Sequence, residues 1–249
     1  MKTSKQIIYL TEIEDYKSFS DFYVAVRKKE NRILNDHEIL NLPKISSQNP
    51  NYSEWKIREK SAKRFTNYLI SKKSKLNILE IGCGNGWFSN LMAATLRSSK
   101  VKAFDINIPE LIQANRIFQR ENLQFVFADI FKLDHNNYNT RFDIIVLNAS
   151  VQYFPNIMNL IYKLKLFLAN NGEIHIIDSP FYKRQDIKSA KQRTLDYYKK
   201  LGFEEMAKYY FHHNKDELKD FEILYTPNQN SLTKIIKGKD SPFVWIKTK

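Results

Sequence analysis

The sequence predicts an α/β fold with a seven-stranded, mostly parallel sheet, helices on both faces, N-terminal helices and a helical insertion. Two observations predict it. In the middle of the chain, apolar runs that end in small or acidic residues alternate with helical stretches, which is the pattern of successive βαβ units. In addition, Phe142–Leu147 holds four consecutive large aliphatic residues, which is typical of a parallel strand buried on both faces.

The expected elements follow this alternation from one end of the chain to the other. We expect strands at Asn77–Ile81, Val101–Asp105, Gln124–Ala128, Phe142–Leu147, Gly172–Ile177, Phe221–Tyr225 and Phe243–Lys247. We expect the intervening helices at Trp87–Arg97, Ile108–Asn122 and Ile157–Ala169. The apolar spacing also predicts a helix from 54 to about 72, with Ser53 as its N-cap.

The chain divides at two changes of pattern. Residues 1–52 are polar and interrupted by prolines, so we expect an N-terminal helical extension with short helices near 15–29 and 36–41. The main domain would then span 53–249. Residues 181–220 interrupt its alternation of strands and helices with a basic helix and an aromatic cluster. We expect this insertion to form a lid, in which 181–213 is a mobile helical segment that contacts a ligand.

Composition excludes several classes of protein. The chain has 249 residues, of which 43% are hydrophobic, and this suits one α/β domain with added segments. The single cysteine, Cys83, excludes an intramolecular disulfide, a cysteine-based zinc site and an iron–sulfur cluster. No apolar run approaches the length of a transmembrane helix, so we expect a cytoplasmic protein. The net charge of +13 suits either a polyanionic partner or a generally basic surface, and the scattered lysines favour the surface.

A glycine-rich motif follows the first expected strand of the sheet. It reads Glu80-Ile81-Gly82-Cys83-Gly84-Asn85-Gly86, and a helix follows it. Such a loop lets a nucleotide approach the backbone at a helix N-terminus. The dinucleotide fingerprint would need a glycine at 87, where the chain has Trp87. No Gly-Lys-Ser/Thr follows either, so the loop is not a P-loop.

This motif resembles that of the class I methyltransferases, which have a Rossmann-like fold and use S-adenosyl-L-methionine (SAM). The resemblance continues along about 53–178: Asp105 ends the second strand, Asp129-Ile130 follow the third, Asn148-Ala149-Ser150 follow the fourth and Gly172 opens the fifth. It implies SAM as cofactor and S-adenosyl-L-homocysteine (SAH) as product. We expect no metal, because Asp178 at the end of the fifth strand is a candidate ligand without a convincing carboxylate partner. The resemblance also implies cofactor-binding roles for Glu80, Gly82, Cys83, Gly84, Gly86, Asp105, Ile106, Asp129, Ile130, Asn148, Ala149 and Arg58.

Each role in the site has a structural alternative. Asp105 suits the ribose hydroxyls, but it could instead cap the following helix. Cys83 suits a small structural residue better than a nucleophile. As catalytic candidates we name Tyr153, which follows the fourth strand, and His212 and His213, which could deprotonate an acceptor hydroxyl or be ordinary surface residues.

The resemblance implies methyl transfer from SAM to oxygen or nitrogen of a small molecule. Residues 150–154, Ser-Val-Gln-Tyr-Phe, resemble those of the quinone-biosynthesis branch, and the aromatic residues predict an apolar or aromatic acceptor. A second hypothesis is an RNA methyltransferase that uses the basic surface, which predicts a continuous basic patch beside the pocket. A third is a non-catalytic SAM-binding regulator or scaffold, which predicts no enclosed acceptor cavity.

Overall fold

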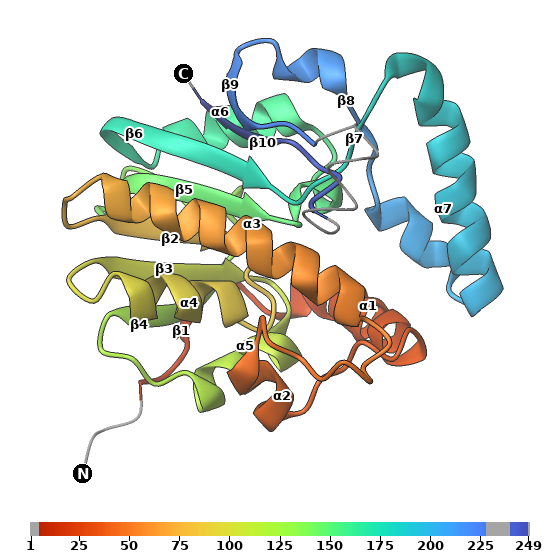
Figure 1. Ribbon diagram of the computed structural model, residues 1–249, viewed down its shortest axis with the longest axis horizontal. Helices are drawn as coiled ribbons and strands as arrows, with labels where there is room; N and C mark the ends of the chain where they lie inside the picture. The colour runs from red at the N-terminus through yellow and green to blue at the C-terminus, as the bar shows by residue number, and fades with distance from the viewer. Residues whose placement is uncertain (1–4, 228–239, 249) are drawn as a thin grey trace.

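The fold is built on an eight-stranded sheet in the order β1-β4-β3-β2-β5-β6-β10-β9 (Figure 1). The computed structural model that shows it describes residues 5–227 and 240–248. Strands β1 to β6 pair in parallel, and β10 runs antiparallel to both β6 and β9. The strands of this sheet are β1 (Ile8–Tyr9), β2 (Asn77–Ile81), β3 (Lys100–Asp105), β4 (Leu123–Phe127), β5 (Phe142–Asn148), β6 (Leu168–Ile177), β9 (Phe221–Tyr225) and β10 (Trp245–Thr248).

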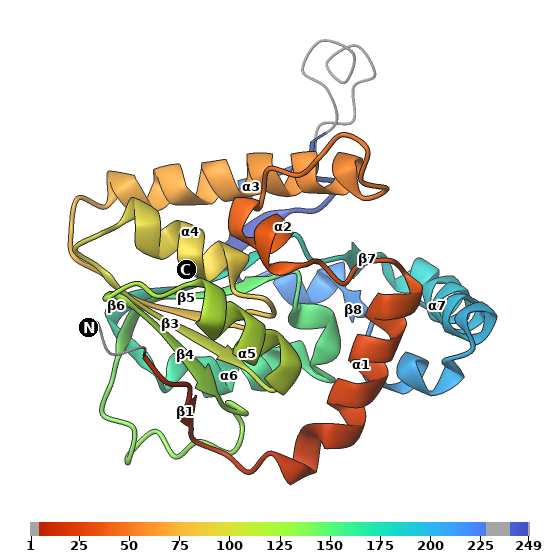
Figure 2. The ribbon, with the colours of Figure 1, turned by 90° about the horizontal axis from the view of Figure 1, so that it is seen from below.

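Helices lie on both faces of the sheet. Figure 2 shows α3, α4 and α5 on one face and α6 on the other. The α-helices of the described residues are α1 (Lys17–Lys29), α2 (Asp36–Asn41), α3 (Tyr52–Ser71), α4 (Trp87–Thr95), α5 (Ile108–Ile117), α6 (Ile157–Lys165) and α7 (Ile187–Leu201). Short 3-10 helices are η1 (Glu14–Tyr16), η2 (Val151–Tyr153), η3 (Arg184–Asp186), η4 (Glu204–Tyr209) and η5 (Lys215–Leu218). Within the described residues, no helix combines the length and apolarity needed to cross a membrane.

The central strands are buried on both faces, as their apolar runs predict. Ile78 and Ile144 face the cluster that includes α3, α4 and α5, whereas their chain neighbours Leu79 and Ile145 face the cluster that includes α6. This alternation follows from the two-residue period of a strand. The α/β class, the mostly parallel sheet and the helices on both faces are therefore confirmed.

The sheet has one more strand than the sequence predicts. The unexpected strand is β1, where Ile8 and Tyr9 pair in parallel with Val126 and Phe127 at the sheet edge. Both β1 residues are exposed, so no buried alternating pattern marks them in the sequence. A second, two-stranded parallel sheet of β7 (Phe181–Tyr182) and β8 (His213–Asn214) lies inside the predicted insertion.

Several expected helix boundaries are corrected. Helix α3 begins at Tyr52 after Asn51, whose side chain accepts no capping hydrogen bond, and Ser53 lies inside the helix. Helices α4, α5 and α6 end two to five residues earlier than their apolar patterns predict. The division into 1–52 and 53–249 stays a prediction, and residues 228–239 and 249 of its second part lie outside the described residues.

Helices α1 and α7 stand beyond the carboxyl ends of the parallel strands (Figures 1 and 2). Helix α1 meets η4 through Phe19 and Tyr209, whose rings are 5.2 Å apart in an edge-to-face arrangement. The side chains of Val26, Tyr198 and Met206 are buried beside them. Two segments far apart in the sequence thus lie over the carboxyl ends of the parallel strands.

We predict that packing around Gly86, and not its backbone angle alone, makes this glycine necessary for the fold. A Cβ at Gly86 would lie 2.6 Å from the ring of Phe125 and 2.9 Å from Ala114 Cβ. Gly202 has a similar φ, +84° against +73°, but an added Cβ there meets nothing within 4 Å.

Gly202→Ala should therefore lower the free energy of unfolding by about 1–2 kcal/mol, the cost of a left-handed alanine. Gly86→Ala should cost about 1–3 kcal/mol more, because it also overpacks the α5–β4 contact. Urea unfolding of both variants measures the difference. Equal losses would contradict the packing argument.

Candidate active site

The glycine loop after β2 is held against β3 by its backbone. The N–H groups of Gly82 and Cys83 both donate to the carbonyl of Phe104, at 2.8 and 3.1 Å. A Cβ at Gly82 would lie 2.6 Å from Ser150 Cβ, so this glycine lets the loop approach the segment after β5. The third glycine, Gly86, lines neither pocket described below, and its role is the α5–β4 contact instead of ligand approach.

Three carboxyl groups surround this loop: Glu80 in β2, Asp105 at the end of β3 and Glu110 in the first turn of α5. Glu80 is 2% exposed and accepts a hydrogen bond from Ser89 Oγ. Burial raises the pKa of Glu80 to about 8, and that of Glu110 to about 7. Burial also raises the pKa of Asp105. The site therefore disfavours its own negative charge until a cation enters.

Asp105 is held by backbone N–H groups. Its Oδ2 accepts from Gly84 N at 2.7 Å, and its Oδ1 accepts from the N–H groups of Ile106 and Asn107 at 2.7 and 2.8 Å. Helix α5 is capped by the Asn107 side chain, so the alternative in which Asp105 caps this helix is wrong. Asp105 instead fixes the turn between β3 and α5 and points toward the glycine loop.

Two adjoining pockets open at the loop. The smaller holds about 120 Å³ and is polar, and the larger holds about 440 Å³. Five residues border both: Tyr23, Gly82, Gly84, Glu110 and Ala149. An elongated ligand that crosses the loop would therefore contact both pockets.

The smaller pocket carries ion pairs from α3. Arg58 and Arg32 both bind the carboxylate of Glu54, at 2.9 and 2.7 Å. These hydrogen bonds keep the pKa of Glu54 low, near 2, despite its burial. Across the pocket, Asn148 Oδ1 is buried and has no hydrogen-bond partner among the described residues, so it can accept a bond from a ligand.

The larger pocket has a polar floor and an aromatic wall. Asp105 and Asp129 lie on the floor, where Tyr16 donates to Asp129 Oδ2 at 2.6 Å. The wall is made by residues of α1, of the segments after β3, β4 and β5, and of η4. Its apolar members are Phe19, Tyr23, Ile106, Ile130, Phe131, Tyr153, Phe154 and Tyr209.

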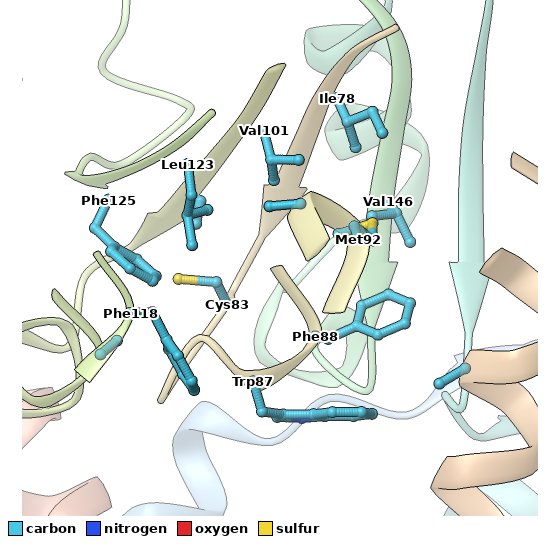
Figure 3. Packing of buried hydrophobic residues seen from close by; sticks show 14 of the residues in the cluster. Ile78, Cys83, Trp87, Phe88, Met92, Val101, Phe118, Leu123, Phe125 and Val146 are labelled. Carbon is cyan, nitrogen blue, oxygen red and sulfur yellow. The ribbon is translucent and has the colours of Figure 1, made fainter. Parts of the chain in front are cut away.

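Most of the residues predicted from the sequence come together here. Glu80, Gly82, Cys83, Gly84, Asn148, Ala149 and Arg58 border the smaller pocket, and Asp105, Ile106, Asp129, Ile130 and Tyr153 border the larger. The Cys83 side chain is buried among apolar residues near Leu123, Phe118 and Phe125 (Figure 3). This burial raises the pKa of the thiol, which suits a structural residue.

The structure does not bring the two predicted histidines to either pocket. His213 is buried, with Nε2 3.1 Å from the carbonyl of Val151, and His212 Nε2 lies 2.9 Å from Thr194 Oγ1. His212 thus contacts α7 within the insertion, and His213 joins the insertion to the segment after β5. Among the described residues, no group of three or more His, Cys, Asp or Glu side chains could hold a metal ion.

Sequence reasoning missed the pocket residues of α1 and α5. Tyr23 and Arg27 come from α1, which no motif links to the sheet. Arg27 donates to Glu30 at 3.2 Å and its guanidinium lies 4.9 Å from the centre of the Tyr23 ring. The missed Glu110 had a possible signal, the Asn-x-x-Glu spacing from Asn107, which marks a helix start.

We predict that Glu80 destabilises the ligand-free protein at neutral and higher pH. Its carboxyl keeps its proton in the native state up to about pH 8, but the unfolded chain loses it above about 4.5. Unfolding then releases a proton, so the contribution of Glu80 to the free energy of unfolding falls as the pH rises through this window.

Glu80→Gln should therefore be more stable than the wild type by a few kcal/mol at pH 8, with the difference shrinking toward pH 5. Urea unfolding across pH 5–8 measures it. The control is Glu12→Gln, which removes an exposed carboxylate. A Glu80→Gln effect that does not change with pH would contradict the burial argument.

Comparison with known proteins supports a single family. The methyltransferase-domain family matches residues 72–236. The malonyl-[acyl-carrier protein] O-methyltransferase of Acetivibrio thermocellus is 28% identical over 139 residues, 55% of this chain and 48% of that protein. The tRNA U34 carboxymethyltransferase of Campylobacter fetus is 28% identical over 138 residues, 54% of this chain and 46% of that protein. The chain thus spans about half the length of these curated relatives.

Solved structures agree on the fold. The plantazolicin methyltransferase BpumL, in complex with a triazolic desmethylPZN analog and SAH, superposes with a TM-score of 0.55 at 17% identity, covering 94% of this chain and 92% of that one. The SAH-bound magnesium protoporphyrin IX methyltransferase of Synechocystis also gives 0.55, at 13% identity, covering 95% and 96%. With its family match and this fold, the chain belongs to the family of methyltransferase domains, in their class I, SAM-dependent form.

Proposed function

We propose that the protein transfers a methyl group from SAM to a small acceptor with an apolar body. The observation that carries this proposal is the pair of pockets that meet at a glycine loop flanked by buried carboxylates. SAM bears a sulfonium and an ammonium, and buried carboxyl groups that ionise when a cation enters would stabilise such a ligand. The unpartnered Asn148 Oδ1 adds an acceptor for a ligand donor. These residues fit the cofactor.

We assign the methionine part of SAM to the smaller pocket and the adenosine part to the floor of the larger. Arg58 would bind the carboxylate, and Asn148 with Glu80 would face the ammonium. Asp105 would accept from the ribose, and Asp129 with Ile130 would contact the adenine. When bound, SAM supplies an electrophilic methyl group. The chain's own contribution is to hold the acceptor in line with it and to exclude water.

The aromatic wall is where we place the acceptor. Phe19, Tyr153 and Tyr209 form it, with ring centroids of Phe19 6.2 Å from Tyr153 and 5.2 Å from Tyr209. Flat apolar walls favour a planar or apolar group. The malonyl-[acyl-carrier protein] O-methyltransferases support oxygen as the acceptor atom. The resemblance to the quinone-biosynthesis branch still rests on residues 150–154 alone.

A carboxylate oxygen would also simplify the chemistry. It is ionised at neutral pH and needs no base before it attacks a methyl group. An acceptor hydroxyl would need a base at the wall, where Tyr153 is our candidate because its ring borders the larger pocket. His212 and His213 are not part of this proposal, because they contact Thr194 and the carbonyl of Val151 and border neither pocket.

Two alternatives make different predictions. The tRNA U34 carboxymethyltransferase match and the net charge of +13 favour an RNA acceptor. Five exposed basic residues lie on α7: Lys188, Lys191, Arg193, Lys199 and Lys200. RNA binding would then fall steeply with salt. A non-catalytic SAM-binding protein is disfavoured by the larger pocket, which extends past the proposed ribose site to the aromatic wall.

We predict that Phe19 contributes to binding of the acceptor and not of the cofactor. Phe19→Ala opens the wall between α1 and η4, so KM for the acceptor should rise about tenfold or more while the affinity for SAM stays unchanged. Phe22→Ala is the matched control, because Phe22 lies on the same helix and packs in the same cluster without bordering either pocket.

Transfer of labelled methyl from SAM to acyl carboxylates, phenols and RNA measures the effect and tests the acceptor class. Salt-sensitive methylation of RNA in preference to the small acids would contradict the proposed function. Equal effects of Phe19→Ala and Phe22→Ala would contradict the placement of the acceptor.

A further inference from the structure

We propose that Glu110 is a ribose-binding residue of this site, which takes one hydroxyl of the cofactor while Asp105 takes the other. The proposal rests on the proposed function, because it presumes that SAM and SAH bind between the two pockets. Glu110 belongs neither to the glycine motif nor to the carboxylates at the strand ends, because it lies in α5.

The first step is the hydrogen-bonding capacity of Asp105. A carboxylate offers about four acceptor positions. Three are taken by the N–H groups of Gly84, Ile106 and Asn107. One position therefore remains on Oδ2, so Asp105 cannot accept from both ribose hydroxyls while it holds the loop.

The second step is the place of Glu110. A Cβ on Gly84 would lie 3.1 Å from Glu110 Oε2, and the N–H of the same glycine donates to Asp105 Oδ2. The two carboxylates thus flank one residue of the glycine loop. Glu110 also borders both pockets. The ribose is the part of SAM that joins adenine to methionine, so it should lie at this junction.

The third step explains why the Glu110 carboxylate is free to bind. Four helical segments of the described chain start with Asn-x-x-Glu. In two of them the glutamate accepts from the N–H of its cap residue, Glu38 from Asn35 and Glu217 from Asn214. In the other two the N–H of the cap is already taken, that of Asn51 in α3 by Asn49 and that of Asn107 in α5 by Asp105.

Glu110 is thereby diverted from the usual capping bond toward the pockets. Its backbone N–H still donates to the Asn107 side chain at 3.3 Å, which fixes it in the first turn of α5. No hydrogen bond from the described residues reaches its carboxylate. Its charged surroundings are Asp105, which raises its pKa, and Arg27, which lowers it. Arg27 offsets part of the increase that burial and Asp105 cause in the pKa of Glu110, which stays raised at about 7.

The test is titration calorimetry with SAH, 2′-deoxy-SAH and 3′-deoxy-SAH. Glu110→Ala should weaken SAH binding about ten- to a hundredfold, because a hydrogen bond to a charged group is lost. It should have little effect on the analogue that lacks the hydroxyl it binds. Asp105→Ala should show the same selectivity for the other analogue.

Two further variants serve as a conservative substitution and as a control. Glu110→Gln preserves the size of the side chain and guards against misfolding, and its loss of affinity should follow the same selectivity. Asp143→Ala is the control. Asp143 also accepts from a backbone N–H, that of Asn77 at 2.7 Å, but it lies at the amino ends of the parallel strands, away from both pockets.

The outcomes separate the inference from the proposed function. If the wild type binds no SAH, the proposed function fails. If the wild type binds SAH and Glu110→Ala either binds it equally well or weakens all three ligands equally, the ribose role of Glu110 is wrong.

Discussion

The burial of three carboxylates around one glycine loop is the constraint on which the rest of this structure depends. Glu80, Asp105 and Glu110 come from β2, β3 and α5, and burial raises the pKa of all three, with the charge of Asp105 raising those of Glu80 and Glu110 further. Backbone N–H groups stabilise Asp105, Ser89 stabilises Glu80, and Arg27 lies near Glu110. The remaining repulsion makes the site unfavourable for anions and favourable for a cation.

Parallel topology places these groups together. The strand order reverses between β2 and β5, where chain connections leave in opposite directions and open a crevice at the carboxyl ends. The glycine loop follows β2, and Asn148 with Ala149 follows β5, so both lie at this switch point. Helix α1 and η4 then cover the crevice with aromatic side chains. The result is a polar end for a charged ligand and an apolar end for a second one.

The sequence predicted the central sheet and the strand-end residues well because local patterns encode them. A short apolar run marks β2, four consecutive aliphatic residues mark β5, and glycine spacing marks the loop. It could not predict β1, whose two exposed residues are held only by pairing with β4. It also misplaced His212 and His213, since only the tertiary fold shows that Thr194 and the carbonyl of Val151 bind them. Glu110 was missed because its release from capping depends on Asp105.

Proton release on binding tests the central claim most directly. If the buried carboxylates ionise when a cation enters, SAM binding at pH 7 should release about one proton, since Glu110 and Glu80 titrate near 7 and 8 in the free protein. Titration calorimetry in buffers of different ionisation enthalpy counts this proton, and SAH, which lacks the sulfonium charge, should release less. Binding of SAM with no proton release, or with proton uptake, would contradict the account.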